Sequence, residues 1–352
     1  QVHRAVLPSG EEVVVKVQRP GIDQVVNTDV EIILGMAHGA EERRKSSVIS
    51  FTDLAEEYAR SITRELDYRI EGQNIERFRG NFANVTTVHV PRVFWHLTSR
   101  RILTMEFIPG MKLQRFRQTE KTPLASEVAH RIADAFVKQV MVDGYFHGDP
   151  HPGNILVEAD GRIAFIDFGL VGRLDSESLD GLTRLFLALM HRDVSRVVET
   201  LIEMGFVDVL GDVRTLRLDI EDMLDRYYGK SLEQISFGYL LNEILQLAYR
   251  YQMHLPQDFL LLSKSLVTME GVVKSLDPDF DVAKAAEPFA RDLAMQRANP
   301  ANMARRWAKD ARDYGRLLVR LPHQLQAVLM KLERGSLAIE FRHAGLESLI
   351  SN

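Results

Sequence analysis

The sequence contains no cysteine, so neither disulfide bonds nor thiolate metal sites are available to it. It also contains no apolar run of about 18 residues, the length that a membrane-spanning helix requires, and no signal peptide is visible. Positive charge is not in excess, because the formal net charge is −5 at pH 7. We therefore expect no nucleic acid among the partners of this chain.

The chain opens at Gln1 instead of a methionine, within residues that have the composition of a strand. We therefore expect it to be a fragment of a longer protein. Its 352 residues exceed what one small hydrophobic core organises, so the length predicts two domains or a bilobal fold.

What the sequence does contain is a spaced set of polar residues in the stretch 147–169, HGDPHPGNILVEADGRIAFIDFG. Asp149 precedes Asn154 by five residues, and Asn154 precedes Asp167 of an Asp-Phe-Gly by thirteen. Protein kinases have this register in their catalytic and metal loops, H-R-D-x-x-x-x-N followed by D-F-G, although Gly148 stands here in place of the arginine. Each residue alone could belong to an ordinary turn, but the set as a whole indicates phosphoryl transfer.

Phosphoryl transfer explains why these residue types are needed, because it depends on positioning and on neutralising phosphate charge. Asp149 is predicted to be the catalytic residue that orients or deprotonates the acceptor. Asn154 and Asp167 are predicted to be the metal ligands that hold Mg²⁺ against the nucleotide phosphates. Between them, residues 155–157 and 162–166 read as two strands of a hairpin, which would place both metal ligands side by side.

A Val-rich run at residues 12–18 predicts a buried strand, and this strand contains Lys16. In protein kinases a lysine on such a strand contacts the α- and β-phosphates of ATP and is paired with a helix glutamate. The alternative is a lysine on an edge strand that faces solvent. The catalytic loop downstream favours the role in catalysis and nucleotide binding.

A long helix is predicted from residue 51 past residue 70, because apolar residues recur there every four positions. Glu71 is the predicted catalytic partner of Lys16, with Glu65 and Asp67 as neighbours that help to bind the nucleotide. The alternative is a solvent-exposed charged helix. Only the combination with Lys16 and the catalytic loop favours the nucleotide site.

Residues 90–95 and 101–107 read as two strands, and the chain that follows has the position of a kinase interlobe hinge. Backbone groups at Glu106 and Phe107 would bind the adenine of the nucleotide, a role that requires no particular side chain. This assignment rests on position in the chain alone.

No long segment separates Asp-Phe-Gly from the next predicted helix, which begins with Ser176 as its cap, and no Ala-Pro-Glu follows. In protein kinases that segment is the platform for a peptide substrate and the site of regulatory phosphorylation. Its absence argues against a peptide kinase and leaves a small molecule, a lipid or water as the acceptor. The rest of residues 175–290 reads as helices broken near Gly205, Gly211, Gly229 and Pro256.

Residues 290–334 have a helical pattern that is rich in arginine and lysine. A basic amphipathic helix can lie on an anionic membrane surface. The alternative is a solvated helix that packs on the rest of the chain.

Taken together, these residues resemble the UbiB (AarF-type) atypical kinase-like family, which is involved in ubiquinone biosynthesis. The match covers nearly the whole chain, and the combination of Glu-x-Asp at residues 65–67 with HGDPHPGN at residues 147–154 is specific to this family. The resemblance also includes residues 1–5, 15–21, Glu71, Asn74, 167–169 and 276–280.

The resemblance implies an α+β, bilobal protein-kinase-like fold with a small β-rich N-lobe and a large helical C-lobe. We place the N-lobe at residues 1–108, the C-lobe at residues 109–290 and a basic helical extension at residues 291–352. The implied cofactors are ATP and Mg²⁺. The family's Lys-x-Gly-Gln segment and Ala-rich nucleotide loop would precede Gln1, so we expect the nucleotide lid to be truncated in this chain.

The implied function is an ATPase, or an atypical ATP-dependent phosphotransferase, that supports ubiquinone biosynthesis at a membrane. Two alternatives stay open: a nucleotide-gated lipid-binding scaffold without phosphotransfer, and a kinase of a small molecule or lipid. The expected partners are ATP, isoprenoid quinone precursors or anionic lipid, and quinone-biosynthesis enzymes. The expected location of the full-length protein is cytoplasmic, peripheral to the inner membrane or anchored at it.

Overall fold

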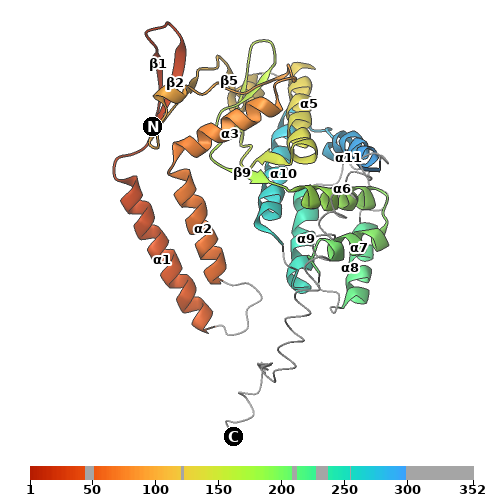
Figure 1. Ribbon diagram of the computed structural model, residues 1–352. Coiled ribbons are helices and arrows are strands. Elements are labelled where there is room, and N and C mark those ends of the chain that lie inside the picture. The colour runs from red at the N-terminus through yellow and green to blue at the C-terminus, as the bar shows by residue number, and fades with distance from the viewer. Residues whose placement is uncertain (44–50, 120–122, 208–211, 227–236, 254, 299–352) are drawn as a thin grey trace, which may run out of the picture. The chain divides into compact units, whose positions relative to one another are not determined.

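Three antiparallel strands form the first sheet of the computed structural model (Figure 1), in the order β1-β2-β4. The central strand β2 is the Val-rich run that the sequence predicts, and its Lys16 lies opposite Val2 and Leu103 in register. Because side chains alternate along a strand, Lys16 shares a face with Val14, which packs against the main core. The strands of this sheet are β1 (Val2–Val6), β2 (Glu12–Val17) and β4 (Ile102–Glu106).

The structure describes residues 1–43, 51–119, 123–207, 212–226, 237–253 and 255–298 of the chain. Residues 1–293 form one compact unit, which contains β1 to β9 and α1 to α10, and residues 294–352 form a second. Within the described residues, no helix has both the length and the apolar character needed to cross a membrane.

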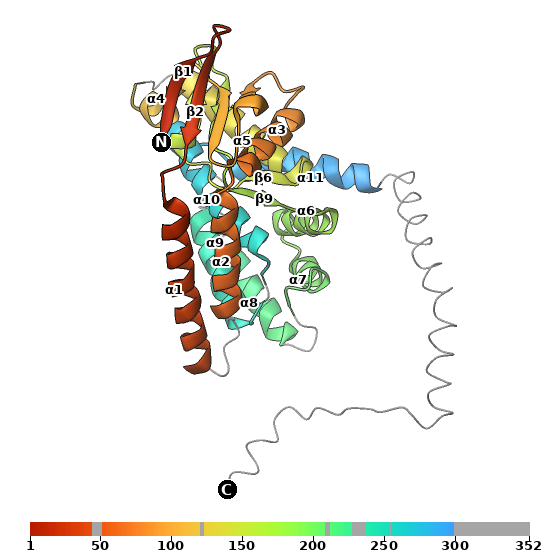
Figure 2. The ribbon, with the colours of Figure 1, turned by 60° about the vertical axis from the view of Figure 1, so that its left-hand side comes forward.

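Two helices follow residue 50 where the sequence predicts one long helix, so that prediction is wrong. They are α2 (Phe51–Glu65) and α3 (Tyr68–Asn81). Asp67 caps α3 by accepting a hydrogen bond from the N–H of Arg69 (3.0 Å), and Nε2 of Gln18 donates to the carbonyl of Leu66 (2.6 Å). These contacts favour the end of α2 at Glu65 and the beginning of α3 at Tyr68, although the apolar residues continue at four-residue spacing through the break. α2 packs against α1 (Ile22–Arg43), as Figure 2 shows.

The strand predicted at residues 90–95 is not a regular strand. Val93 forms an isolated bridge with Met105 of β4, and a 3₁₀ turn, η1 (Trp95–Leu97), follows it. Pro91 lacks the N–H that a continuous ladder of hydrogen bonds needs at this position.

Two further sheets support the loops of residues 147–169. One has four strands in the order β3-β8-β7-β5, and the other pairs β6 with β9. The antiparallel pair β7–β8 confirms the predicted hairpin, and Gly161 provides the left-handed φ of +80° in its turn. The strands are β3 (Val88–His89), β5 (Met111–Lys112), β6 (Tyr145–His147), β7 (Ile155–Val157), β8 (Ile163–Phe165) and β9 (Val171–Arg173).

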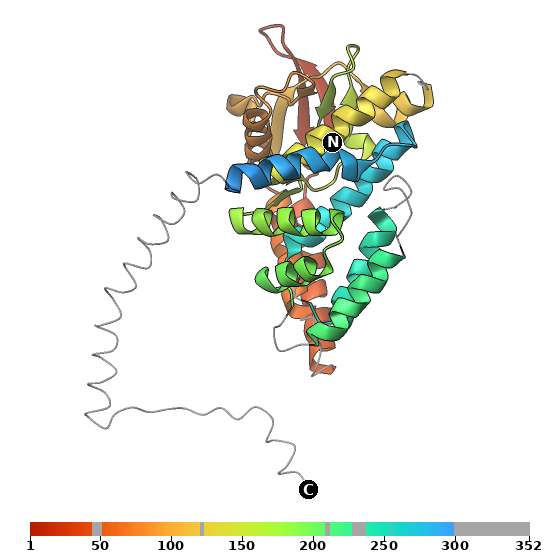
Figure 3. The same ribbon diagram turned by 90° about the vertical axis from the view of Figure 1, so that its right-hand side faces the viewer.

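Helices form most of the remainder, and α10 lies along α5 while α6 packs on α7 (Figure 3). The predicted breaks at Gly205 and Pro256 are confirmed, whereas those at Gly211 and Gly229 lie outside the described residues. The cap of α6 is Asp175, one residue before the predicted Ser176. The elements are α4 (Leu113–Thr119), α5 (Pro123–Val137), the π-helical turn η2 (Lys138–Val142), the 3₁₀ turn η3 (Pro152–Asn154), α6 (Ser176–Met190), α7 (Val194–Glu203), α8 (Val213–Asp225), α9 (Phe237–Arg250), α10 (Gln257–Leu276) and α11 (Val282–Ala298).

One hydrophobic core joins the strands to the helices. Its buried members include Phe78 of α3, Phe165 of β8 and Met269 of α10. The chain is therefore α+β, with a small β region and a mostly helical remainder, as the sequence predicts. The boundaries at residues 108 and 290 stay predictions, and the basic segment from residue 299 onward lies outside the described residues.

Candidate active site

Lys16 and Glu71 form the ion pair that the sequence predicts. Nζ of Lys16 donates to both carboxylate oxygens of Glu71, at 2.7 and 2.9 Å. Burial lowers the pKa of Lys16, but the carboxylates of Glu71 and Asp167 outweigh this effect and the pKa is raised. Burial raises the pKa of Glu71, and Lys16 opposes that shift. The two short hydrogen bonds favour the ionised pair, because both oxygens of Glu71 accept from one ammonium.

Asp167 lies next to this pair and completes a cluster of one lysine and two carboxylates. Its Oδ2 is 3.5 Å from Nζ of Lys16, and its side chain is 43% exposed, whereas that of Glu71 is 5% exposed. Oδ1 accepts a hydrogen bond from the N–H of Gly169 (3.0 Å). The carboxylate of Asp167 is therefore partly exposed to solvent while its Oδ1 is held by the N–H of Gly169.

The α3 helix is tied directly to the Asp-Phe-Gly loop. Nδ2 of Asn74 donates to the carbonyl of Phe168 (2.8 Å), and the hydroxyl of Tyr145 donates to Oδ1 of Asn74 (2.6 Å). The N–H of Phe168 donates to Oε1 of Glu71 (3.4 Å). The Phe168 ring packs against Phe78, with centroids 4.9 Å apart. The position of Glu71 and that of Asp167 are thus fixed by the same contacts.

The hairpin β7–β8 brings Asn154 beside Asp167. The N–H of Ile166 donates to the carbonyl of Asn154 (3.1 Å), and Nδ2 of Asn154 donates to the carbonyl of Asp149 (3.2 Å). Among the described residues, no three histidine or carboxylate side chains are close enough to hold a metal by themselves. Asn154 and Asp167 offer two oxygen ligands, which suits Mg²⁺ because this ion keeps several waters and takes further oxygens from phosphates.

His147 braces the catalytic loop from a fully buried position. Its backbone N–H donates to Oε1 of Gln139 (2.9 Å), and its Nδ1 accepts from the N–H of Asp149 (3.0 Å). Burial lowers the pKa of His147 to about 4, although the charges of Asp167 and Asp149 oppose this shift. A neutral imidazole that accepts a backbone hydrogen bond has a structural role in this loop.

The α10 helix contacts the predicted catalytic loop at Gly148 and Asp149, and the sequence did not indicate this contact. Oγ of Ser265 donates to the carbonyl of Gly148 (2.9 Å), and Nζ of Lys264 lies 3.9 Å from Oδ1 of Asp149. A Cβ atom on residue 148 would lie 2.8 Å from Cγ of Leu170 and 3.1 Å from Cδ1 of Leu261. The arginine of the kinase pattern therefore has no space at this position. In the sequence, one feature singles out Lys264: it is the only charged residue in the run 259–268, where all the other residues are apolar or carry a hydroxyl group.

Glu65 and Asp67 differ in their relation to this cluster. Glu65 ends α2, and its pKa is raised by desolvation first and then by the nearby negative charges of Asp167 and Glu71. Asp67 forms an ion pair with Arg69 (2.6 Å), and this hydrogen bonding lowers its pKa. Glu65 thus faces the site, whereas Asp67 is engaged as a helix cap. A role for either in nucleotide binding stays a prediction.

Glu106 and Phe107 lie at the end of β4, and their N–H groups already have partners. The N–H of Glu106 donates to the carbonyl of Arg92 (2.9 Å), and that of Phe107 to the carbonyl of Glu12 (3.2 Å). Adenine binding through these two N–H groups would require both hydrogen bonds to open. Adenine binding at Glu106 and Phe107 stays a prediction.

Comparison with known proteins places two domain families on the chain. Residues 1–201 match the ABC1 atypical kinase-like domain, and residues 220–281 match the UbiB helical domain. An uncharacterised protein of Synechocystis is 32% identical over 372 residues, which is 99% of this chain and 65% of that protein. A probable protein kinase UbiB of Marinobacter nauticus is 34% identical over 313 residues, which is 86% of this chain and 56% of that protein.

A solved structure also resembles the chain. The complex of Rv3197 with erythromycin, from Mycobacterium tuberculosis, has a TM-score of 0.61 at 23% identity, and the match covers 82% of this chain and 73% of that one. These findings confirm the resemblance and the fold class that the sequence predicts. The chain spans only about half to two thirds of the length of the curated relatives that it matches.

Proposed function

Because the chain belongs to the family of ABC1 atypical kinase-like domains, we propose that it binds ATP with Mg²⁺ and transfers the γ-phosphate to water. The observation that supports this best is the convergence of Lys16, Glu71 and Asp167, with Lys16 Nζ 2.7 Å from Glu71 and 3.5 Å from Asp167. A lysine that two carboxylates keep charged is suited to bind phosphate oxygens.

Each residue of the cluster has a defined task in this proposal. Lys16 binds the α- and β-phosphates, and Glu71 holds its ammonium in place. Asn154 and Asp167 hold Mg²⁺, which neutralises charge on the phosphates. Asp149 orients a water molecule toward the γ-phosphorus and accepts its proton as the bond to the bridging oxygen of ADP breaks.

Water is favoured over a peptide as acceptor, because the chain has no room for a peptide platform. β9 (Val171–Arg173) follows Asp-Phe-Gly at once and pairs with β6, and α6 then begins at Ser176. In protein kinases the activation segment occupies this part of the chain.

The biological role that we propose rests on the resemblance to the UbiB family and on relatives that carry this name. The proposed activity belongs to isoprenoid quinone synthesis at the inner membrane, with quinone precursors or anionic lipid and the biosynthetic enzymes as partners. The relatives are longer proteins, and their remaining segments are not covered by this chain.

Following the γ-phosphate of labelled ATP tests the proposal. We expect Mg²⁺-dependent release of labelled inorganic phosphate, and we expect Asp149→Asn to bind ATP but release little phosphate. Label transferred to a lipid or small molecule would instead support a kinase. ATP that is bound but never consumed would contradict hydrolysis and support a nucleotide-gated binding protein.

Lys264 is expected to act as a positioning residue for this reaction, since its Nζ lies 3.9 Å from Oδ1 of Asp149. Lys264→Gln should lower the rate of phosphate release roughly 10-fold while ATP affinity changes little, because a donor aimed at developing charge contributes about 100- to 1,000-fold and this ammonium is 59% exposed and 3.9 Å from Asp149. Lys264→Arg should recover part of the rate. Lys274→Gln is the matched control, because Lys274 lies on the same helix but pairs with Glu270 (2.8 Å). Equal effects of the two glutamine variants would contradict this role.

A further inference from the structure

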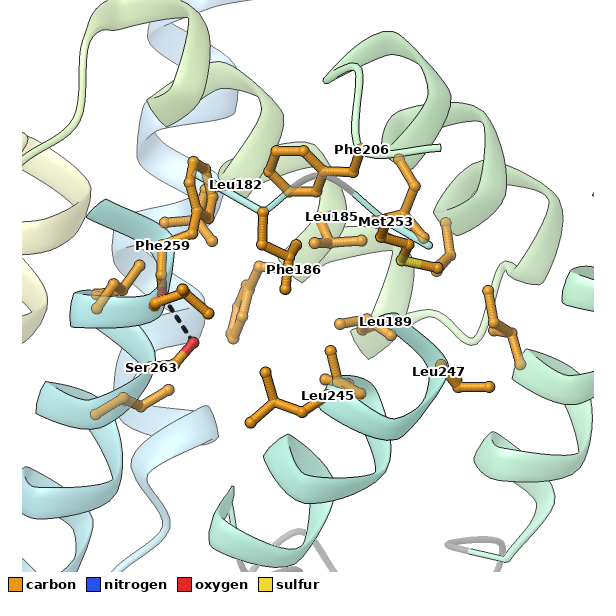
Figure 4. Close-up of a pocket in the computed structure, with 18 of the residues that line it drawn as sticks. Leu182, Leu185, Phe186, Leu189, Phe206, Leu245, Leu247, Met253, Phe259 and Ser263 are labelled. Atoms are coloured by element: carbon orange, nitrogen blue, oxygen red, sulfur yellow. Dashed lines mark hydrogen bonds between the residues drawn. The ribbon is translucent and has the colours of Figure 1, made fainter. Parts of the chain in front are cut away.

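Helices α6 to α10 line a cavity of about 240 Å³ that is partly open to solvent and that shares no lining residue with the proposed nucleotide site. Figure 4 shows leucine and phenylalanine side chains from several helices pointing into it, among them Phe186, Leu189 and Leu245. Among the described residues that line it, Ser263 is the only polar one, and its hydroxyl donates to the carbonyl of Phe259 (2.8 Å) within α10. This lining offers contacts to an apolar ligand and offers a polar ligand no hydrogen bond.

An apolar cavity of this size that is open to solvent needs an explanation, because burial of apolar surface is favourable and this lining leaves Leu245 and Leu260 38% and 40% exposed. Water in this cavity finds no free hydrogen-bond partner in the described lining, whereas an engineered apolar cavity of about 150 Å³ binds benzene. Scaled by volume from benzene, this cavity of about 240 Å³ accommodates roughly ten carbon atoms. A phosphate, amide or ammonium is excluded, because burial without hydrogen bonds is unfavourable.

The α10 helix separates the cavity from the catalytic loop. Phe259, Ser263 and Leu266 line the cavity. Leu261 and Ser265 contact the catalytic loop at Gly148. At about 100° per residue these two groups lie on opposite faces of the helix. The cavity is thus not an extension of the phosphate-binding site.

We propose that this cavity binds the hydrocarbon segment of an apolar ligand, roughly ten carbon atoms long, with any polar group of that ligand outside the cavity. Linear alkyl chains and branched isoprenoid chains share this chemistry. The proposal goes beyond ATP hydrolysis and does not depend on it, because the described lining includes no residue of the nucleotide cluster.

Two lining methionines provide a direct test in the purified chain without nucleotide. Met223 and Met253 line the cavity, whereas Met36 of α1 is 71% exposed and lies elsewhere. With ¹³C-labelled methionine methyl groups, assigned through single Met→Leu variants, n-decanol and geraniol are titrated separately. We expect saturable shifts at Met223 and Met253 and none at Met36. The alcohol that binds with the higher affinity shows whether the cavity prefers a linear or a branched chain.

A second test fills the cavity with a larger side chain and measures whether binding of the alcohols is lost. Leu189→Trp and Leu245→Trp should each weaken binding about tenfold or more, because the indole occupies the space of the ligand. Leu218→Trp is the control, since Leu218 of α8 is 53% exposed and does not line the cavity. Thermal unfolding identifies variants that remain folded, and using two fillers keeps the test valid if one of them does not fold.

Absence of any shift at Met223 and Met253 with both alcohols would overturn the proposal. Undiminished binding in a folded filler variant would also overturn it. Asp167→Asn should bind the alcohols as the parent chain does. The proposed ATPase activity can therefore fail without affecting this result, and the reverse also holds.

Discussion

Asp167→Asn is expected to remove Mg²⁺-dependent ATP binding, with a loss of affinity of about 100-fold or more. Loss of an outer-shell partner alone costs about 10- to 100-fold in metal affinity, and Asp167 would be a direct ligand. The substitution is nearly isosteric, and an asparagine oxygen can still accept the hydrogen bond from Gly169. The loop should therefore keep its conformation while the metal loses its only anionic protein ligand in the proposed set.

Calorimetry of ATP binding with Mg²⁺ and with a chelator measures this effect. Asp160→Asn is the matched control, because Asp160 lies in the exposed turn of the β7–β8 hairpin and pairs with Arg162. The control should bind Mg²⁺-ATP as the parent chain does. Unchanged affinity of the Asp167 variant, or an equal loss in the Asp160 variant, would rule out Asp167 as the metal ligand.

Lys16→Met is expected to destabilise the fold as well as abolish ATP binding. It leaves the carboxylate of Glu71, which is 5% exposed, without its cation. Breaking a buried ion pair by removing one partner typically costs about 3–5 kcal/mol. Urea denaturation should therefore show a lower free energy of unfolding for this variant.

The double variant Lys16→Met/Glu71→Leu separates the two effects. Replacing both members of a buried pair by apolar residues is often neutral for stability, so most of the lost stability should return. ATP binding should not return, because the phosphates still lack their lysine. Lys112→Met, at an exposed lysine of β5, is the control for both measurements. A Lys16→Met variant as stable as the parent chain would mean that the pair is not buried and ionised in solution.

The sequence predicts the part of the site that is local in the chain. Asp149, Asn154 and Asp167 belong to one loop and hairpin, so their spacing alone places them in neighbouring parts of the chain. Lys16 and Glu71 are farther apart, but each lies in an element with a recognisable pattern, a Val-rich strand and a charged helix. Local patterns of this kind account for the β7–β8 hairpin and for the ion pair of Lys16 with Glu71, whereas the functional roles of these residues stay predictions.

The features that the sequence does not predict depend on contacts between distant segments. The break at residues 66–67 depends on Gln18, which donates to the carbonyl of Leu66, whereas the apolar stripe continues through the break. The support of Gly148 by Ser265 joins residues 117 positions apart. Apolar periodicity likewise indicates which side chains of α6 to α10 face inward, but not that their packing leaves a cavity.

The hydrogen bond from Ser265 to Gly148 also determines how late in synthesis on the ribosome the candidate site is completed. Lys16 and Glu71 leave the exit tunnel early, and the catalytic loop follows them. The helix that supports this loop is translated more than 100 residues after it. A nascent chain that ends before residue 257 contains Lys16 and Glu71 but lacks α10, whose Ser265 donates to the carbonyl of Gly148. Incomplete chains therefore lack a finished site until α10 has emerged.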